Sequence, residues 1–433
     1  MDSLLDQLSR QEVWEEFLAH RLMKGRFTWH AFEDADAYVA AEAYRPAAER
    51  LIRGESPGIP ERKAINKMGS GKKRIVYSFN AEMTPVLKLL AYLLYKYDGA
   101  FAPNCYSFRG GLRASDAILQ LRSALRGRPM WAYKLDIHDY FNSIPVPSLL
   151  PLLRDLLQDD SLLYRFFETM LSDGPGGVLP GTPTAPFLAD VYLMDADHFF
   201  AREGVLYARY SDDIILFAPD RAALEARKAE LLGFLSRKGL EINPDKERIY
   251  PPEEPFDFLG FRCRGEQIGI AGASLEKMKG KIRRAARALR RWQQRKGLSP
   301  EQAMKGLVNT FNNKFFGGDD PEELSWSRWF FPVINSTDGL LEIDHYLQQY
   351  IRYAGTGRHS RANYRIRYDD LRRIGYRSLV HEFYRYKAAS GTILARKDSK
   401  PYDDEKALDN PDSDPARDSR RLGPDGLRGQ LQK

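Results

Sequence analysis

The sequence predicts an α+β fold, and three patterns of residues carry that prediction. WAYKLDI, at residues 131–137, alternates apolar and polar side chains as a half-buried strand does. VLYARY and IILFAP stand on either side of the short segment 211–213 and predict a β-hairpin. Residues 275–296 carry apolar side chains three and four positions apart, which predicts one long helix. A chain of 433 residues is long enough to combine such elements in two or three domains.

The composition is that of a soluble globular protein, with 43% hydrophobic and 29% charged residues. No apolar run approaches the ~18 residues of a membrane span, and the N-terminus lacks the pattern of a secretory signal. We therefore expect a cytoplasmic protein with no membrane partner. Two cysteines, Cys105 and Cys263, exclude a disulfide framework and a paired CxxC zinc site, and the seven histidines form no HExxH motif. A metal ion should then be held by carboxylates, which favours Mg²⁺.

Positive charge is concentrated in two stretches, although the net charge is only +7. Residues 277–296 hold ten Lys and Arg and no acidic residue. Residues 352–387 hold ten more against three acidic residues, interleaved with tyrosines. Basic stretches with aromatic side chains are typical of nucleic-acid surfaces. A solvated helix face with buried tyrosines explains the same composition, and composition alone does not decide between the two.

The other elements follow in order along the chain. Residues 1–58 have a helical pattern, and the basic segment 59–80 predicts strands around a Gly-Ser-Gly turn. Asp220 is the expected N-cap of a helix that Gly239 closes. The polar tail 397–433 has little to bury, and we expect it to be disordered. Further helices are expected at 83–97, 114–125, 147–172 and from Phe187, with a Gly/Pro loop at 174–186.

Three aspartates are the candidate metal ligands. Asp212 and Asp213 are adjacent at the tip of the predicted hairpin, where two repelling carboxylates favour a divalent cation or exposure to solvent. Asp136 ends the strand before them and lies beside the tip if these strands pair in one sheet. Three carboxylates there would hold two Mg²⁺ ions, one activating a primer 3′-hydroxyl and the other neutralising the leaving pyrophosphate. An ordinary polar turn and a strand-end aspartate that caps a turn are the alternatives.

Two further residues suit a nucleotide site. Phe141, five residues after Asp136, would exclude a 2′-hydroxyl with its ring, and it is equally compatible with a core position. Gly181, in the Gly/Pro loop, permits close backbone approach to a nucleotide or a template base. The same loop is also compatible with an ordinary connection between helices.

The ordered set of motifs resembles that of reverse transcriptases. LDIHDYFNSI, LPGTPTAPFLADVYL and ARYSDDIILF resemble their motifs A, B and C. KKRIVYSFN and NCYSFRGG resemble the fingers motifs, KGLEINPDKER resembles motif D and FDFLGF resembles the primer grip. The match covers about residues 60–262 and is most similar to the prokaryotic branch of group II intron and retron enzymes, especially those associated with antiphage defence. It implies a right-hand polymerase with fingers, a ferredoxin-like palm and a helical thumb.

The resemblance also implies roles for individual residues. Asp136, Asp212 and Asp213 would bind two Mg²⁺ ions, for which Mn²⁺ is the expected substitute, and the carbonyl of Ile137 would join them. Phe141 would be the steric gate that favours deoxynucleotides. The other nucleotide-binding residues implied are Lys72 and Arg74 on the triphosphate, Gly181 beside the nucleotide and Lys246 near the pyrophosphate.

The sequence departs from the family pattern in several places. Pro180 stands where the family usually has Gln, and Ala185 where it usually has Ser, so two hydrogen-bonding groups near the template or the incoming base are missing. Fidelity or template handling is therefore expected to differ, while the metal ligands are unaffected. The retron thumb signature Val-Thr-Gly is absent, and no Cys-rich or His/Asn-rich endonuclease segment follows, which disfavours an intron-mobility enzyme.

Two segments are predicted to bind nucleic acid. In the basic helix, an apolar stripe runs from Leu275 to Trp292, and the cations lie largely off that stripe, where they can face phosphates. Residues 326–387 resemble the C-terminal region of defence-associated reverse transcriptases, which work on a dedicated non-coding RNA. The predicted contacts are Lys281, Arg283, Arg284, Arg287, Arg290, Arg291, Arg361, Arg365 and Arg367.

Together these features predict an RNA-directed DNA polymerase that makes cDNA on a dedicated structured non-coding RNA in antiphage defence, using a DNA or RNA primer and dNTPs. An intron or retroelement enzyme, a template-independent DNA synthesiser and a catalytically idle RNA-binding protein are the alternatives. The expected domains are an N-terminal helical region (1–58), fingers (59–130), palm (131–262), thumb (263–330), a helical RNA-binding extension (331–396) and the tail (397–433).

Overall fold

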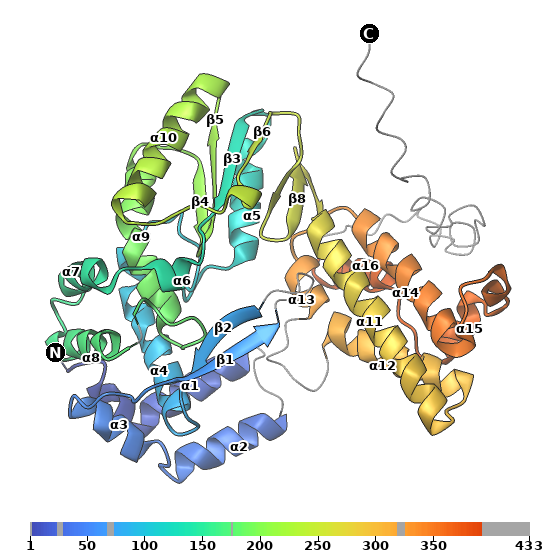
Figure 1. The fold of residues 1–433 in the computed structure, drawn as a ribbon, viewed down its shortest axis with the longest axis horizontal. Helices are drawn as coiled ribbons and strands as arrows, with labels where there is room; N and C mark the ends of the chain where they lie inside the picture. The colour runs from blue at the N-terminus through green and yellow to red at the C-terminus, as the bar shows by residue number, and fades with distance from the viewer. Residues whose placement is uncertain (1, 24–28, 67–72, 175, 318–324, 392–433) are drawn as a thin grey trace. The chain divides into compact units, whose positions relative to one another are not determined.

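The computed structural model describes residues 2–23, 29–66, 73–174, 176–317 and 325–391. Lys72 and the tail 397–433 therefore lie outside the described residues. The chain divides into two compact units, the first formed by residues 1–285 and 310–343 and the second by residues 286–309 and 344–433. Figure 1 shows the fold and labels most of its helices and strands.

Helical segments open the first unit, as the sequence predicts: a 3₁₀ helix at Asp6–Ser9, α1 (Gln11–Met23), α2 (Trp29–Ala40) and α3 (Arg45–Ile52). Trp14 of α1 joins them, because its buried ring stacks on Tyr44 at a centroid distance of 4.6 Å and meets Tyr38 edge to face. Its indole Nε1 donates to the Leu8 carbonyl oxygen over 2.8 Å. A buried indole needs such an acceptor, so the aromatic cluster also fixes the chain that leads into α1.

Two basic strands follow. β1 (Glu61–Asn66) pairs antiparallel with β2 (Lys73–Ser78), and Glu61 lies opposite Ser78. α4 (Met83–Leu93) is the predicted apolar helix, but its last predicted residues continue as a tighter 3₁₀ helix, Leu94–Ala100, which is a common way for a helix to end. α5 (Ala114–Leu125) has the predicted bounds.

The central sheet of the first unit has antiparallel strands in the order β4-β5-β3-β6. In chain order, β3-α9-β4-β5-α10-β6 with this strand order is the ferredoxin-like arrangement. The predicted α+β fold with a ferredoxin-like palm is therefore confirmed. The elements are β3 (Trp131–Asp136), α9 (Ala185–Arg202), β4 (Tyr207–Tyr210), β5 (Asp213–Ala218), α10 (Arg221–Arg237) and β6 (Arg248–Tyr250).

Helix α10 begins and ends at the predicted residues. The Asp220 carboxylate accepts a hydrogen bond from the Ala223 N–H over 2.8 Å and so satisfies a donor of the first turn. Gly239, just beyond the helix, has a φ of +67°, the left-handed conformation that commonly ends helices. Buried leucines on one face of α10 pack it against β3 and β5.

Three helices lie between β3 and α9, namely α6 (Tyr140–Ser143), α7 (Val146–Leu156) and α8 (Ser161–Ser172). The segment 147–172 is helical, as predicted, and it forms the two helices α7 and α8, with Asp160 between them. Its buried carboxylate caps α8 by accepting from the Leu163 N–H over 3.0 Å, and it also accepts from the Leu4 N–H over 2.8 Å. The Asp160 side chain thus caps the start of α8 and also holds the backbone of residue 4 in place.

A second sheet precedes the long basic helix. β7 (Phe256–Phe258), β8 (Phe261–Arg264) and β9 (Gln267–Ile270) pair in sequence order, and α11 spans Gly272–Lys296. The prediction for the apolar stripe of this helix is wrong at its end. Trp292 is 46% exposed, whereas Ala286 and Gln293 are buried. The predicted 3-4 spacing averages 3.5 residues and drifts around a helix with 3.6 residues per turn, so the buried face moves on by one residue.

The remaining helices include α14, in which Asp344 is fully enclosed. Its carboxylate accepts hydrogen bonds from the Tyr376 and Ser378 hydroxyls, each over 2.7 Å, and from the Leu379 and Val380 N–H groups over 2.9 and 3.1 Å. Burial raises the pKa of this carboxyl to about 6, and the hydrogen bonds that it accepts oppose the rise. In the described part of the chain, no helix has the length and apolar character to cross a membrane. The helices after α11 are α12 (Pro300–Phe316), α13 (Trp326–Phe330), α14 (Asp338–Thr356), a 3₁₀ helix at Arg361–Arg365, α15 (Tyr368–Arg373) and α16 (Leu379–Ala389).

The Gly/Pro loop before α9 lies against strand β2. The Tyr77 N–H donates to the Pro180 carbonyl oxygen over 2.8 Å. Gly181 has a φ of +98°, and a Cβ there would lie 2.9 Å from the Tyr77 carbonyl oxygen and 3.1 Å from Val76 Cβ. Glycine is therefore required twice at this position, by its backbone conformation and by the close approach of the β2 backbone.

We predict that Gly181→Ala destabilises the protein by about 2–4 kcal/mol, from the strained φ together with the clash against β2. Gly176→Ala is the matched control, because Gly176 has a φ of +96° but no atom within 4 Å of the added Cβ. The control should cost only about 1–2 kcal/mol, from backbone strain alone. Denaturant unfolding of both variants measures the difference, and equal losses would mean that the approach of β2 imposes no constraint.

Candidate active site

The candidate active site lies where β3 ends beside the β4–β5 hairpin. Asp136, the last residue of β3, pairs with Asp213, the first residue of β5. The Ile137 N–H donates to the Asp212 carbonyl oxygen over 3.0 Å, which extends the pairing one step beyond the strand. Antiparallel pairing therefore brings together aspartates that are far apart in the sequence.

The hairpin turn is as short as a hairpin turn can be. Tyr210 and Asp213 pair across the hairpin, which leaves only Ser211 and Asp212 to reverse the chain. Ser211 has a φ of +59°, the left-handed conformation that two-residue turns of this kind use. The direction in which the Asp212 side chain leaves the backbone is therefore set by the conformation of Ser211.

Two lysines neutralise part of the negative charge. Lys246 Nζ lies 2.5 Å from Asp136 Oδ2, and Lys134 Nζ lies 3.2 Å from Asp213 Oδ1. Burial raises the pKa of the Asp212 carboxyl, and the charge of Asp136 raises it further. Burial also raises the pKa of Asp213, an effect that Lys134 opposes. The site therefore holds acidic groups whose ionised forms need a nearby cation.

The donor chemistry of the site fits Mg²⁺. Carboxylate oxygens are the hard ligands that Mg²⁺ prefers, and a divalent cation relieves repulsion among several of them. Within the residues that the structure describes, however, no three His, Cys, Asp or Glu side chains are grouped as a metal site. Lys246 and Lys134 hold two of the carboxylates in ion pairs, so a bound metal ion would compete with these ammonium groups for the carboxylate oxygens.

Phe141 lies beside the Gly/Pro loop. It belongs to α6, and its carbonyl oxygen accepts a hydrogen bond from the Val178 N–H over 2.9 Å. Its half-buried ring meets the Tyr140 ring at a centroid distance of 5.8 Å. A half-buried ring at this position is compatible with both the gate and the core interpretation.

Among the predicted nucleotide-binding residues that the structure describes, Lys246 is the one that pairs with an aspartate of the site. Arg74 is exposed on β2, three residues before the Tyr77 that contacts the loop. Most of the predicted basic-helix residues are exposed, but Lys281 is half-buried and Arg290 donates to Gln293. The exposed members are Arg283, Arg284, Arg287 and Arg291 in α11, and Arg361, Arg365 and Arg367 in and after the 3₁₀ helix that follows α14.

A buried charged cluster behind the hairpin escaped the sequence analysis. Arg209 of β4 is fully buried and forms ion pairs with Asp190 and Asp197 of α9. Two signals in the sequence point to it in retrospect. Arg209 is a lone cation just before the hairpin turn, and the two aspartates stand seven residues apart in a largely apolar helix, which puts them on the same face.

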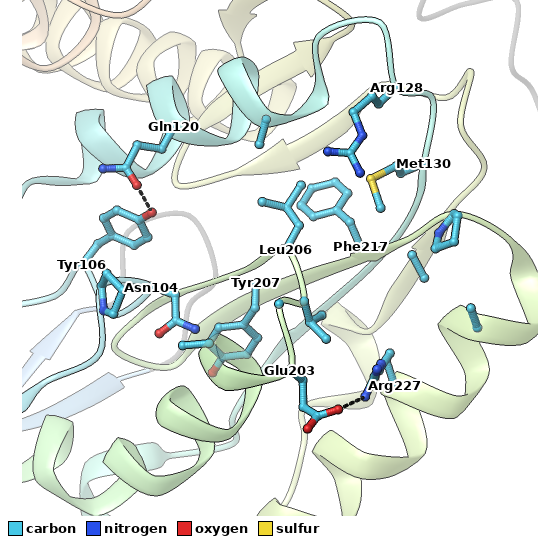
Figure 2. A pocket seen from close by; sticks show the side chains of 18 residues that line it. Asn104, Tyr106, Gln120, Arg128, Met130, Glu203, Leu206, Tyr207, Phe217 and Arg227 are labelled. Atoms are coloured by element: carbon cyan, nitrogen blue, oxygen red, sulfur yellow. Dashed lines mark hydrogen bonds and ion pairs between the residues drawn. The ribbon is translucent and has the colours of Figure 1, made fainter.

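A cavity of about 690 Å³ lies at the ends of β4 and β5 that are remote from the hairpin turn, and Figure 2 shows the residues that line it. It is lined by Leu206 and Phe217 of the hairpin, together with residues of α5, of α10 and of the segment before α5. Across its walls, the Tyr106 hydroxyl donates to Gln120 and Arg227 pairs with Glu203. None of the predicted site residues lines this cavity, so it is separate from the candidate active site.

The middle of the chain is similar to proteins of a known family. Residues 65–263 match the family described as reverse transcriptase (RNA-dependent DNA polymerase). Over 141 residues the chain is 28% identical to the retron Mx65 reverse transcriptase of Myxococcus xanthus, with 27% of this chain and 32% of that protein covered. Over 157 residues it is 26% identical to the retron Ec86 reverse transcriptase of Escherichia coli, with 34% and 47% covered. The chain thus spans less than half the length of either curated relative.

Solved structures with some similarity include two telomerases. The telomerase of Candida albicans, in complex with a TWJ fragment of telomeric RNA, gives a TM-score of 0.41 at 12% identity and covers 82% of this chain and 70% of that one. A truncated apo telomerase of Candida tropicalis gives 0.39 at 15% identity, with 49% and 55% covered. TM-scores below 0.5 add no argument about the fold.

The family match contains both sides of the candidate active site, since Asp136 and the Asp212–Asp213 pair fall within the matched residues. It also contains every strand of the ferredoxin-like sheet. Residues 65–263 therefore match the reverse transcriptase family and resemble two prokaryotic retron enzymes, and they hold the ferredoxin-like sheet that the sequence predicts for the palm.

Proposed function

We propose that this protein is an RNA-directed DNA polymerase that uses two Mg²⁺ ions. The observation that carries the proposal is the pairing of Asp136 with Asp213, which gathers the aspartates of two motifs at one point of a reverse transcriptase domain. A two-metal mechanism needs carboxylates at one point, because both ions must be fixed relative to the attacking and leaving oxygens. Asp212 and the carbonyl of Ile137 are the further proposed ligands, and Mn²⁺ is the expected substitute ion.

When bound, the two ions would activate the primer 3′-hydroxyl and neutralise the leaving pyrophosphate. The lysines of the site have a complementary task. Lys246 is nearly half exposed, so its ammonium group can leave Asp136 and turn toward solvent. We assign it to the pyrophosphate, as a cation and as a proton donor. Lys134 would keep the charge of Asp213 tolerable in the absence of metal.

We assign nucleotide selection to the Gly/Pro loop and to residues of α6 and β2 that lie beside it. Phe141 would be the gate against a 2′-hydroxyl, Gly181 would let the backbone approach the nucleotide, and Arg74 would contact the triphosphate together with Lys72. Two backbone hydrogen bonds support this grouping, because Val178 binds Phe141 and Pro180 binds Tyr77 of β2. The loop is thereby tied both to the residue proposed as the gate and to the strand that carries Arg74.

We propose further that the template is a dedicated structured non-coding RNA, in a cytoplasmic antiphage system, and that the second unit binds it. There the Tyr353 ring stacks on His359 at a centroid distance of 4.4 Å, and the Arg352 guanidinium lies 5.4 Å from the ring of the exposed Tyr364. Aromatic planes beside cations suit splayed bases and phosphates. The domain scheme of fingers (59–130), palm (131–262), thumb (263–330) and RNA-binding extension (331–396) is part of this proposal.

Replacing Asp136, Asp212 or Asp213 by Asn should reduce nucleotide incorporation by about 100-fold or more, because each change removes a charged metal ligand. Primer extension with Mg²⁺ and with Mn²⁺ measures this loss. Glu241→Ala is the control, since Glu241 is an exposed acidic residue whose backbone carbonyl binds His138 next to the site. A folded Asn variant with activity close to that of the control would remove its residue from the proposed site.

Phe141→Ala should let ribonucleotides enter, because the ring is proposed to fill the space of the 2′-hydroxyl. The measurement is the ratio of dNTP to NTP incorporation, which should fall by about 10-fold or more, as expected for removal of a steric clash of more than ~1.4 kcal/mol. Phe141→Leu retains most of the bulk and should change the ratio little. If Phe141→Ala loses stability but keeps the wild-type ratio, the ring is a core residue.

Expression in its host should yield the protein together with one defined, structured RNA. Changing Arg361, Arg365 and Arg367 to Glu should remove that RNA, since cations that contact phosphates become anions. The control changes Arg202, Arg221 and Arg237 to Glu, which alters the net charge equally. These three arginines are exposed on α9 and α10. Sequencing of the bound RNA shows whether each variant carries one defined RNA or bulk cellular RNA. Bulk cellular RNA on every variant would contradict a dedicated partner.

A further inference from the structure

Arg209 is the cation buried most deeply in the central sheet among the described residues. It stands in β4, two residues before Ser211 of the turn, and none of its side chain is exposed. Its backbone is held at the edge of the sheet, because its N–H donates to the Asn104 carbonyl oxygen over 3.0 Å and its carbonyl oxygen accepts from the Tyr106 N–H over 2.9 Å. The guanidinium group therefore starts from a fixed position.

The guanidinium group grips two carboxylates on one face of α9. Its Nε lies 2.9 and 3.1 Å from the two Asp197 oxygens, and its Nη1 lies 3.0 Å from Asp190 Oδ1. Further donors complete both acids, since Ser107 Oγ donates to Asp190 over 2.6 Å and Tyr207 donates to Asp197 over 3.0 Å. The result is a fully satisfied polar network in which each member has only one workable orientation.

Stability alone does not explain such a network. Taking an arginine and two carboxylates out of water is costly, and apolar side chains of similar volume often serve a buried position as well or better. Burial raises the pKa of Asp190 to about 6, a sign of that cost even with Arg209 beside it. The planar guanidinium group of Arg209 makes hydrogen bonds in fixed directions and so fixes the orientation of the groups that it binds. An apolar contact does not fix an orientation in this way.

The same guanidinium reaches the turn that carries the proposed metal ligands. Its Nη1 lies 3.4 Å from the Ser211 carbonyl oxygen, which belongs to the peptide group between Ser211 and Asp212. Ser211 is in the left-handed conformation, which is costly for a residue other than glycine and needs support from its surroundings. Arg209 therefore connects α9, the helix that follows the Gly/Pro loop, to the peptide that precedes Asp212.

We infer that Arg209, held by Asp190 and Asp197, is a positioning residue that fixes the Ser211–Asp212 peptide and thereby the direction of the hairpin carboxylates toward metal. This inference rests on the proposed metal site, and it extends that proposal to residues that touch neither metal nor substrate. Arg209→Lys keeps the charge but loses the planar fork, so the turn loses one of its supports while the strand pairing remains.

Arg209→Lys should lower kcat by about 10-fold or more and weaken Mn²⁺ binding several-fold, because a small displacement of ligands is enough to cost that much. The KM for dNTP should stay within about twofold of wild type, since none of the described residues proposed to contact the nucleotide, Phe141, Gly181, Arg74 and Lys246, is a hydrogen-bond partner of the Arg209 side chain. The hairpin amides 207–216 should exchange hydrogen faster, a readout that needs neither metal nor catalysis.

Asp197→Asn and Asp160→Asn form the matched pair of variants. Both remove the charge of a buried carboxylate in the first unit, but Asp160 caps α8 and makes no recorded contact with the hairpin. Asp197→Asn should reproduce the effects of Arg209→Lys, and Asp160→Asn should lower stability without changing kcat or Mn²⁺ binding. Equal kcat losses in both variants, in proportion to lost stability, would overturn the inference.

A fourth variant, in which Asp190, Asp197 and Arg209 become Leu, Leu and Met, replaces the whole charged network by apolar side chains. Apolar replacement of a buried ion network is often tolerated. If this variant folds with wild-type kcat, Mn²⁺ affinity and hairpin exchange, the network is structural filling and the inference is wrong. If it does not fold, Arg209→Lys decides by the same three measurements. Failure of the wild type to extend primers would contradict the proposed function instead, while hairpin exchange would still test the positioning.

Discussion

The register between β3 and β5 is the constraint on which the rest of the site depends. The Asp136 and Asp213 carboxylates repel each other, so they cannot hold the strands together; apolar neighbours do this instead. Leu135, Ile214 and Leu216 are buried around the pairing. Because side chains alternate from face to face along a strand, a slip of one residue would send Asp136 and Asp213 to opposite faces. Hydrophobic burial thus holds the Asp136 and Asp213 carboxylates close together although their charges repel. A cation bound between them would relieve this repulsion.

Charges near the hairpin fall into two sets that burial separates. In front, Lys246 and Lys134 contact the carboxylates from positions with partial access to water, so their places can be taken by other cations. Behind, Arg209 and its two aspartates are closed off from solvent and satisfy one another. The proposed metal site needs both sets of charges. The partly exposed lysines can give up their places beside the carboxylates to a metal ion, while the buried Arg209 network keeps the backbone of the hairpin in place.

The Gly/Pro loop joins parts of the chain that the sheet does not connect. Pro180 binds the Tyr77 N–H on β2, and Val178 binds the Phe141 carbonyl oxygen on α6. Gly181 permits the contact with β2 because it has no side chain to collide with that strand. Of the two departures from the family pattern, Pro180 therefore falls in a loop that backbone hydrogen bonds hold in place, and Ala185 is the first residue of α9. These bonds make the loop geometry depend on backbone groups more than on the side chains that the family usually has there.

By itself, the sequence determined the local elements and the chemistry of the motifs. Alternation over 131–137, the hairpin around Ser211 and the caps of α10 at Asp220 and Gly239 are decided by short-range patterns, and they are present in the structure. The tertiary structure alone decided which charges meet. The Lys246–Asp136 pair, the burial of Arg209 against α9 and the exposure of Trp292 on α11 depend on how elements pack across long sequence separations. Periodicity within an element predicts which of its faces is buried. Which residues of two elements then meet depends on strand register and on the rotation of each helix, and a shift of one residue changes these contacts without changing the local pattern.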